Sequence, residues 1–174
     1  MKKTLPLLAL LCISHICWSA APTVAVSYSG VLVAEPCVIP PGKENIELDF
    51  GTVIDKYLYL NQRTPGKEFS LQLTECDLSL GETVSVSFSG TESVALPGLL
   101  AINSGGASGI AIGLENTAGE LLTLNQPAGK QRLQAGSNII TLRAYVRGEP
   151  EAIKNSAIGR GAFSAVATFL LHYD

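Results

Sequence analysis

Residues 163–174 alternate strictly between two sets of positions, which predicts a β-strand. The segment reads F-S-A-V-A-T-F-L-L-H-Y-D. Because side chains on a strand point alternately to opposite faces, one face of this strand is wholly apolar and must be covered. That face comprises Phe163, Ala165, Ala167, Phe169, Leu171 and Tyr173. No later segment follows to pair with the free edge, so the pattern predicts a sheet that another molecule completes. The alternative is an ordinary core strand in a complete sandwich.

A second alternating segment, T-V-A-V-S-Y-S-G-V-L-V-A at residues 23–34, lies near the other end. Its apolar face comprises Val24, Val26, Tyr28, Gly30, Leu32 and Ala34. A spare strand in front and an unpartnered strand behind predict a link in a head-to-tail polymer, because such a contact does not close on itself. The alternative is a first strand that pairs within its own domain.

The residues between these segments predict several short strands. We expect strands at residues 45–50, 68–75, 83–89, 110–114, 120–124 and 137–147, separated by Gly- and Pro-rich turns. Strands at this spacing are typical of a β-sandwich. Residues 95–113 are expected to form a loop or a segment that changes sheets, and residues 150–155 one helical turn at most.

The first residues are typical of an export signal. Lys2 and Lys3 form a basic start, residues 5–16 are apolar, and small residues follow at 19–21. This pattern predicts a signal peptide over residues 1–20 with cleavage near 19–21. Its removal leaves about 154 residues, enough for one domain with a core. We expect no stable membrane insertion of this remainder, because no later segment is long and apolar enough.

Charge argues against one class of partner. The full chain has a formal net charge of −3, and without the two early lysines the remainder carries about −5. An acidic domain is poorly suited to bind nucleic acid, so we expect no nucleic-acid partner.

Cysteine usage predicts a single disulfide. Of four cysteines, two precede the expected cleavage site, and Cys37 and Cys76 remain. An even pair in an exported protein favours a disulfide over two free thiols. Closing this loop of about 40 residues would stabilise the fold by about 4 kcal/mol in the chain-entropy model.

Candidate chemistry is sparse. The exported part has one histidine, His172, and no paired-cysteine motif, so we expect no metal site. It lacks a G-x-S-x-G nucleophile motif, and the G-G-A-S-G segment at residues 105–109 lacks the lysine of a phosphate-binding loop. We therefore expect no enzyme activity, no catalytic residues and no cofactor.

A set of motifs in order carries a family resemblance. They are A-E-P-C at 34–37, L-Q-L-T-E-C at 71–76, V-S-F-S-G-T at 86–91, A-L-P-G at 95–98, G-I-A-I-G-L at 109–114 and A-T-F-L-L-H-Y-D at 167–174. The chain resembles chaperone–usher pilus subunits, the fimbrial pilins of Gram-negative bacteria. Through G-T-E-S-V-A-L-P-G at residues 90–98, it is particularly similar to minor tip-adaptor subunits of the P-pilus type.

The resemblance implies an all-β fold, an incomplete immunoglobulin-like β-sandwich that lacks its final strand. A donor strand from a chaperone or a neighbouring subunit would complete it. Residues 21–36 would be the donor-strand extension and residues 37–174 the pilin domain. The implied partners are a periplasmic pilus chaperone, an outer-membrane usher and neighbouring subunits. The protein would pass through the periplasm to a cell-surface fimbrium.

The resemblance also assigns residues to roles. The donor face would be Val24, Val26, Tyr28, Gly30, Leu32 and Ala34. The acceptor groove and chaperone contact would be Phe163, Ala165, Ala167, Phe169, Leu171, Tyr173 and Asp174. Basic residues of the chaperone would hold the Asp174 carboxylate by charge-assisted hydrogen bonds.

The resemblance leaves three roles open. A minor or adaptor subunit that polymerises by donor-strand exchange and supports bacterial adhesion is favoured. A major rod pilin is the first alternative. A tip adhesin that binds host glycans is less favoured, because such a protein would carry a further receptor-binding domain and no donor arm.

Overall fold

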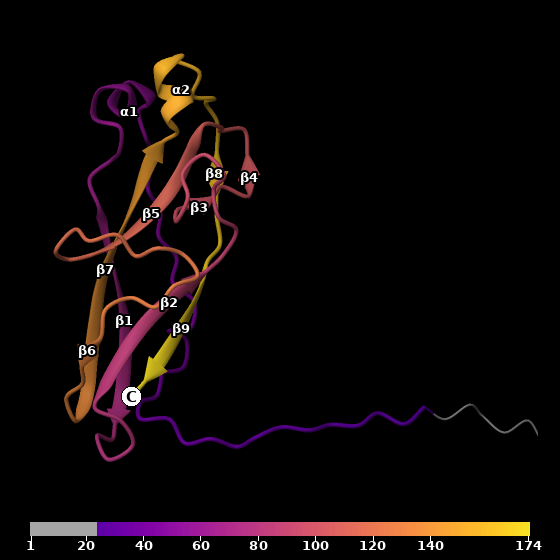
Figure 1. The fold of residues 1–174 in the computed structure, drawn as a ribbon, viewed down its shortest axis with the longest axis vertical. Helices are drawn as coiled ribbons and strands as arrows, with labels where there is room; N and C mark the ends of the chain where they lie inside the picture. Colours follow the sequence, from indigo (N-terminus) through magenta and orange to yellow (C-terminus); the bar gives the residue numbers. More distant parts are fainter. Residues whose placement is uncertain (1–23) are drawn as a thin grey trace, which may run out of the picture. The chain divides into compact units, whose positions relative to one another are not determined.

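A computed structural model of the protein describes residues 24–174 (Figure 1). Residues 33–174 form one compact unit that holds every helix and strand of the described chain. Residues 24–32 belong to a separate unit and carry no helix or strand. The predicted signal peptide lies outside the described residues.

Two antiparallel sheets build the larger unit, as Figure 1 shows. The first sheet has the order β1 (Lys67–Cys76), β7 (Gly136–Gly148), β5 (Ile110–Asn116) and β3 (Leu100–Ala101). The second has the order β6 (Gln131–Arg132), β2 (Thr83–Ser89) and β9 (Thr168–Tyr173). A small two-stranded ladder joins β4 (Ser104–Gly105) to β8 (Phe163–Ser164).

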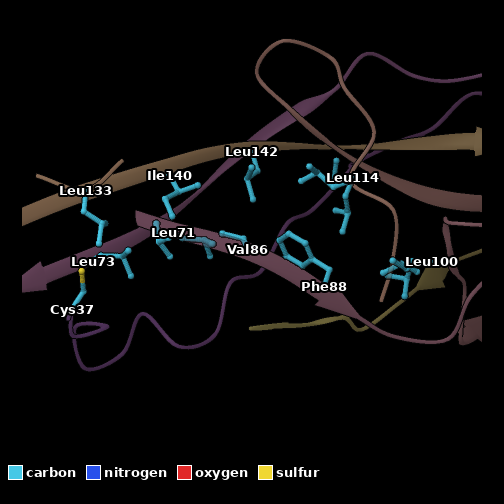
Figure 2. Packing of buried hydrophobic residues seen from close by; sticks show 14 of the residues in the cluster. Cys37, Leu71, Leu73, Val86, Phe88, Leu100, Leu114, Leu133, Ile140 and Leu142 are labelled. Atoms are coloured by element: carbon cyan, nitrogen blue, oxygen red, sulfur yellow. The ribbon is translucent and has the colours of Figure 1, made fainter. Parts of the chain in front are cut away.

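The core lies between the inner faces of the sheets (Figure 2). Val84, Val86 and Phe88 of β2 are all buried, and they belong to the same cluster as Leu71 of β1 and Leu142 of β7. Alternate residues along each strand therefore supply the core, as the period of two requires.

Two short helices lie at one end of the sandwich, α1 (Asp55–Asn61) and α2 (Pro150–Lys154). Leu58 of α1 is buried, and the Tyr59 hydroxyl accepts a hydrogen bond from the Ile158 N–H at 3.1 Å. Asp55 pairs with Arg160 at 2.7 Å. Helix α2 matches the single turn expected at 150–155, whereas α1 was not predicted. Its Tyr-Leu-Tyr-Leu pattern alternates like a strand and is too short to show a helical period.

Four of the expected strands are confirmed as β1, β2, β5 and β7. The expected strands at 45–50 and 120–124 are wrong, because neither segment forms a ladder with a neighbour, although Glu115 and Leu121 make an isolated bridge. The expected continuous strand at 163–174 is divided into β8 and β9. Strand β2 ends at Ser89, opposite Thr168, so it offers no ladder to residues 165–167.

The disulfide between Cys37 and Cys76 is confirmed. Both residues are buried within the main core. The bond fastens the start of the segment 38–53 to the end of β1. An isolated β-bridge between Val38 and Thr74 joins the same two segments beside the disulfide.

Candidate strand-binding groove

Within the described chain, strand β9 is paired along a single edge. Six residue pairs join it to β2, from Val84 opposite Tyr173 to Ser89 opposite Thr168. Within residues 24–174, no other strand forms a ladder with β9. The six residues predicted to share the apolar face are each only partly buried and pack against the core: Phe163, Ala165, Ala167, Phe169, Leu171 and Tyr173. The alternation is thus confirmed, and the apolar face is half covered.

A groove opens beside this segment. Residues 44–48 and Phe50 line one wall, and residues 165–167 with Phe169 line the other. The remaining lining residues come from both sheets: Phe69, Phe88, Leu100, Ile112, Leu114 and Ala144. Figure 2 shows Phe88, Leu100 and Leu114 among these core side chains. A second hollow, lined by residues 48–53 and 161–165, continues the groove toward α1. The groove therefore exposes the apolar interior of the sandwich.

The wall at residues 44–50 forms no ladder with any strand of the described chain. Within residues 24–174, no backbone hydrogen bond links it to residues 165–173. Leu48 and Phe50 turn partly inward, and the Phe50 ring lies 6.2 Å from the Phe163 ring, centroid to centroid. Lys67 Nζ donates a hydrogen bond to the Asp49 carbonyl. A strand added in the groove would have backbone hydrogen-bonding groups available on two sides, at β9 and at this wall.

Sequence reasoning did not assign this wall or the residues between the sheets to the site. The alternation of Ile46, Leu48 and Phe50 was the signal that could have identified the wall. A segment that lies beside an inserted strand is expected to alternate with a period of two, as these residues do. The groove-lining residues from the sheets carried no separate signal, since they read as ordinary core positions.

Tyr173 brings a polar atom to the C-terminal part of β9. Its hydroxyl is buried and has no hydrogen-bond partner among residues 24–174. Burial raises the pKa of Tyr173, and the nearby Glu35 carboxylate adds to this rise. A buried hydroxyl without a hydrogen-bond partner is costly, so a strand inserted beside β9 would be favoured if it offered a partner to the Tyr173 hydroxyl.

Asp174 and His172 lie outside the groove's apolar face. The Asp174 backbone carbonyl accepts hydrogen bonds from the N–H groups of Glu82 and Thr83, at 3.0 and 3.1 Å. Its side chain pairs with Lys130 at 2.9 Å, and both partners are exposed. His172 Nε2 lies 3.0 Å from the Ser87 hydroxyl on the outer face of β9.

The predicted donor face carries exposed side chains. Val24, Tyr28 and Leu32 are 85%, 91% and 101% exposed, and Val26 and Ala34 are exposed as well. No strand is formed between residues 24 and 34, and no atom lies within 4 Å of the place where a Gly30 Cβ would be. The donor roles of these residues remain predictions.

Other chemistry is limited. Within the described chain, no group of three or more His, Cys, Asp or Glu side chains could hold a metal ion. In the same residues, no helix is long and apolar enough to cross a membrane.

Comparison with known proteins identifies the family. Residues 26–174 match the family of fimbrial proteins. The chain belongs to this family. It is 30% identical to the fimbria A protein of Serratia marcescens, with 86% of this chain and 83% of that protein covered. It is also 30% identical to the fimbrial adapter PapK of Escherichia coli, with 85% of this chain and 86% of that protein covered.

A solved structure agrees with this assignment. The crystal structure of the P pilus rod subunit PapA matches with a TM-score of 0.70 and 25% identity, over 80% of this chain and all of that chain. The protein is thus a structural fimbrial subunit of the chaperone–usher type, with an incomplete immunoglobulin-like sandwich. The sequence-based expectations of family and fold are confirmed.

Proposed function

We propose that this subunit is a minor, adaptor-type pilin that polymerises by donor-strand exchange. The observation that carries the proposal is β9, whose half-covered apolar face borders an open groove. A strand inserted there would bury that face and pair with the free edge. The arm at residues 24–34 is the segment of this chain suited to fill the groove of another subunit.

The energetics favour a long-lived joint. A large apolar side chain transferred from water into a groove contributes about 1.5–3 kcal/mol. Val24, Val26, Tyr28 and Leu32 offer four such side chains in series, and main-chain hydrogen bonds would add to them. Because Gly30 interrupts the row, we expect a shallow place in the acceptor groove at that position.

Before assembly, the groove needs a temporary occupant. We propose that a periplasmic chaperone supplies a strand to it and that exchange for a subunit's arm occurs at an outer-membrane usher. The exposed pair of Lys130 and Asp174 is worth little, so basic chaperone residues could replace Lys130 at the Asp174 carboxylate. Export by a signal peptide and a final location in the surface fimbrium follow from this route, as does a structural rather than catalytic role.

The adaptor role is supported by the likeness to PapK over most of both chains. The match to the PapA rod subunit favours a second candidate, a major rod pilin. Immunogold labelling of fimbriae separates them. A minor subunit labels only a short stretch near the tip or at a junction, one or several copies long, whereas a rod subunit decorates the whole shaft.

The donor-strand proposal is tested by periplasmic expression with and without a co-expressed pilus chaperone. We expect the subunit to aggregate or be degraded alone and to co-purify one-to-one with the chaperone. A stable soluble monomer without help would mean that the sandwich is already complete, and the proposal would fail.

Neighbouring residues of β9 provide a matched pair of variants. Phe169→Asp places a charge in the groove and should abolish chaperone capture. Leu170→Asp places the same charge on the outer face, where Leu170 is already 44% exposed, and should leave capture intact. Equal loss in both variants would indicate a general folding defect instead of a groove effect.

A further inference from the structure

An apolar stripe lies exposed on α1 where the groove ends. The stripe consists of Ile54, Tyr57 and Leu60, which are 59%, 41% and 84% exposed. Ile54 is the N-cap residue just before the helix, and the three-residue spacing of Tyr57 and Leu60 places these two on one side of the helix. A hollow beside Ile54 and Tyr57 is lined also by Phe50 and Val53, which line the groove as well. The α1 stripe is therefore continuous with the groove.

The opposite end of the sandwich presents a second apolar surface, on the turn at residues 77–82. Leu78 and Leu80 are 36% and 51% exposed, and Val38 nearby is 47% exposed. The turn is ordered, because the Asp77 carboxylate accepts hydrogen bonds from the Ser79 N–H and hydroxyl at 2.9 and 2.7 Å. Figure 1 shows this end, where β1 finishes and β2 begins, far from the two helices.

The geometry of strand insertion brings these two surfaces together. A strand that completes an immunoglobulin-like sandwich after β9 runs antiparallel to it. Residues 24–34 and residues 163–173 are equal in length, so full pairing places Ala34 of the arm opposite Phe163. Phe163 packs against the cluster that contains Leu58 of α1. The donor's arm thus leaves the groove beside α1.

Little chain separates the arm from the donor's own sandwich. Three residues carry the chain from Ala34 to Cys37, and an extended chain covers about 10 Å in that number of residues. Cys37 is fastened to Cys76, the residue before the 77–82 turn. The donor's 77–82 turn must therefore lie close to the acceptor's α1.

We propose that the α1 stripe docks the 77–82 turn of a second copy of this chain, whose arm fills the groove. The inference rests on the proposed donor-strand exchange. A second copy fits because this chain carries both apolar surfaces and opposite charges beside them. Exposed Lys56 lies on α1, and exposed Asp77 and Glu82 lie on the turn. Docking would fix the angle between successive subunits, which the arm alone would leave free to bend.

The proposal predicts a specific cross-link. The full chain carrying Leu60→Cys and Leu78→Cys is purified with its chaperone and allowed to assemble with itself, and then treated with a short thiol cross-linker. We expect covalent dimers and longer ladders. The control pairs Leu60→Cys with Leu121→Cys, since Leu121 is 46% exposed but bridges to Glu115 of β5 and is not part of the turn. Assembly without a cross-link specific to Leu78→Cys would overturn the docking.

A synthetic peptide of residues 24–34 separates this inference from the proposed function. If the peptide displaces the chaperone but the full chain never assembles with itself, the second copy is the wrong occupant and donor-strand exchange stands. If neither occurs, both proposals fail. A surface variant gives an independent measure: Leu60→Asp should slow self-assembly about threefold or more, because it sets like charge opposite Asp77. Peptide uptake should not change, and equal assembly rates would overturn the docking.

Discussion

Phe88 and Phe169 face the same core from neighbouring strands and lie directly opposite each other. Phe88 is 6% exposed, whereas Phe169 is only partly buried. The residue type, the sheet and the register are the same. The difference is that the second edge of β2 is occupied, by β6 at Thr83 and Val84 and by the Asn125 N–H that donates a hydrogen bond to the Phe88 carbonyl, whereas within residues 24–174 β9 forms a ladder with β2 alone. Burial of an apolar strand thus depends on its neighbours as much as on its own sequence.

The sharpest way to break this comparison is truncation of the two phenylalanines. Phe88→Ala should lower the free energy of unfolding by about 3–5 kcal/mol, and Phe169→Ala by less while the groove is empty. With a bound peptide of residues 24–34, the two costs should become similar, because both rings are then enclosed. Urea unfolding of the purified chain, refolded at low concentration to limit aggregation, measures this with and without peptide. Equal costs in the empty state would contradict the comparison.

Loss of the disulfide should have the next largest effect on stability. The double variant Cys37→Ala and Cys76→Ala should be less stable by about 2–5 kcal/mol. It should also bind the peptide more weakly, because the bond fastens the start of the groove wall at residues 38–53. Thermal unfolding and peptide titration measure the two effects. As a control, the unmodified chain refolded in reductant should behave like the variant; unchanged peptide affinity would show that the wall is held by other contacts.

Two ion pairs on the outer face of the first sheet extend the comparison between buried and exposed groups. Glu115 is 3% exposed and pairs with Arg63 at 2.8 Å, and the Arg63 Cζ lies 3.7 Å from the Tyr145 ring centroid. Arg63→Met leaves a buried carboxylate unpaired and should cost about 1–3 kcal/mol, reduced from a fully buried pair because Arg63 is partly exposed.

The matched control for that pair is Arg143 and Glu68, which also lie 2.8 Å apart and whose arginine is about equally exposed, but whose Glu68 side chain is 58% exposed against 4% for Glu115. Arg143→Met should cost about 0–1 kcal/mol. Chemical unfolding of both variants measures the difference. A cost for Arg143→Met equal to that for Arg63→Met would show that burial of the carboxylate does not set the scale.

The smallest expected effect is a change in the stability of the fold at acidic pH. The hydrogen bond from Arg160 lowers the pKa of Asp55 below its ordinary 3.8. A carboxyl with a lowered pKa stabilises the fold above its unfolded pKa, and this contribution is lost as the pH falls through the folded pKa. Asp55→Asn should therefore be slightly less stable than the unmodified chain at pH 7, and the gap should close below about pH 3.8. Thermal unfolding across this range checks it, and a gap that widens in acid would refute the assignment.

Much of the fold could be predicted because the strands alternate clearly. Residues 83–89 and 163–173 show a period of two, and the six apolar residues of the latter all turn toward the core. The site was only half predicted. Residues 44–50 alternate equally well but form no ladder with any other segment of residues 24–174, and a period of two alone does not distinguish a paired segment from an unpaired one. Helix α1 was missed because its seven residues are held by Leu58 in the core and by contacts with residues near α2, which lie far away in the sequence.

The sequence by itself determined which side chains are apolar and how they alternate, and it predicted the pairing of Cys37 with Cys76. These are local properties, set by residue type and by the geometry of a strand. Only the tertiary structure decided which edge of each strand is paired, where the groove opens, and that the α1 stripe lies at its end. Hydrogen-bond partners and coverage come from segments distant in the chain, so an apolar strand reads the same whether its second neighbour is present or absent.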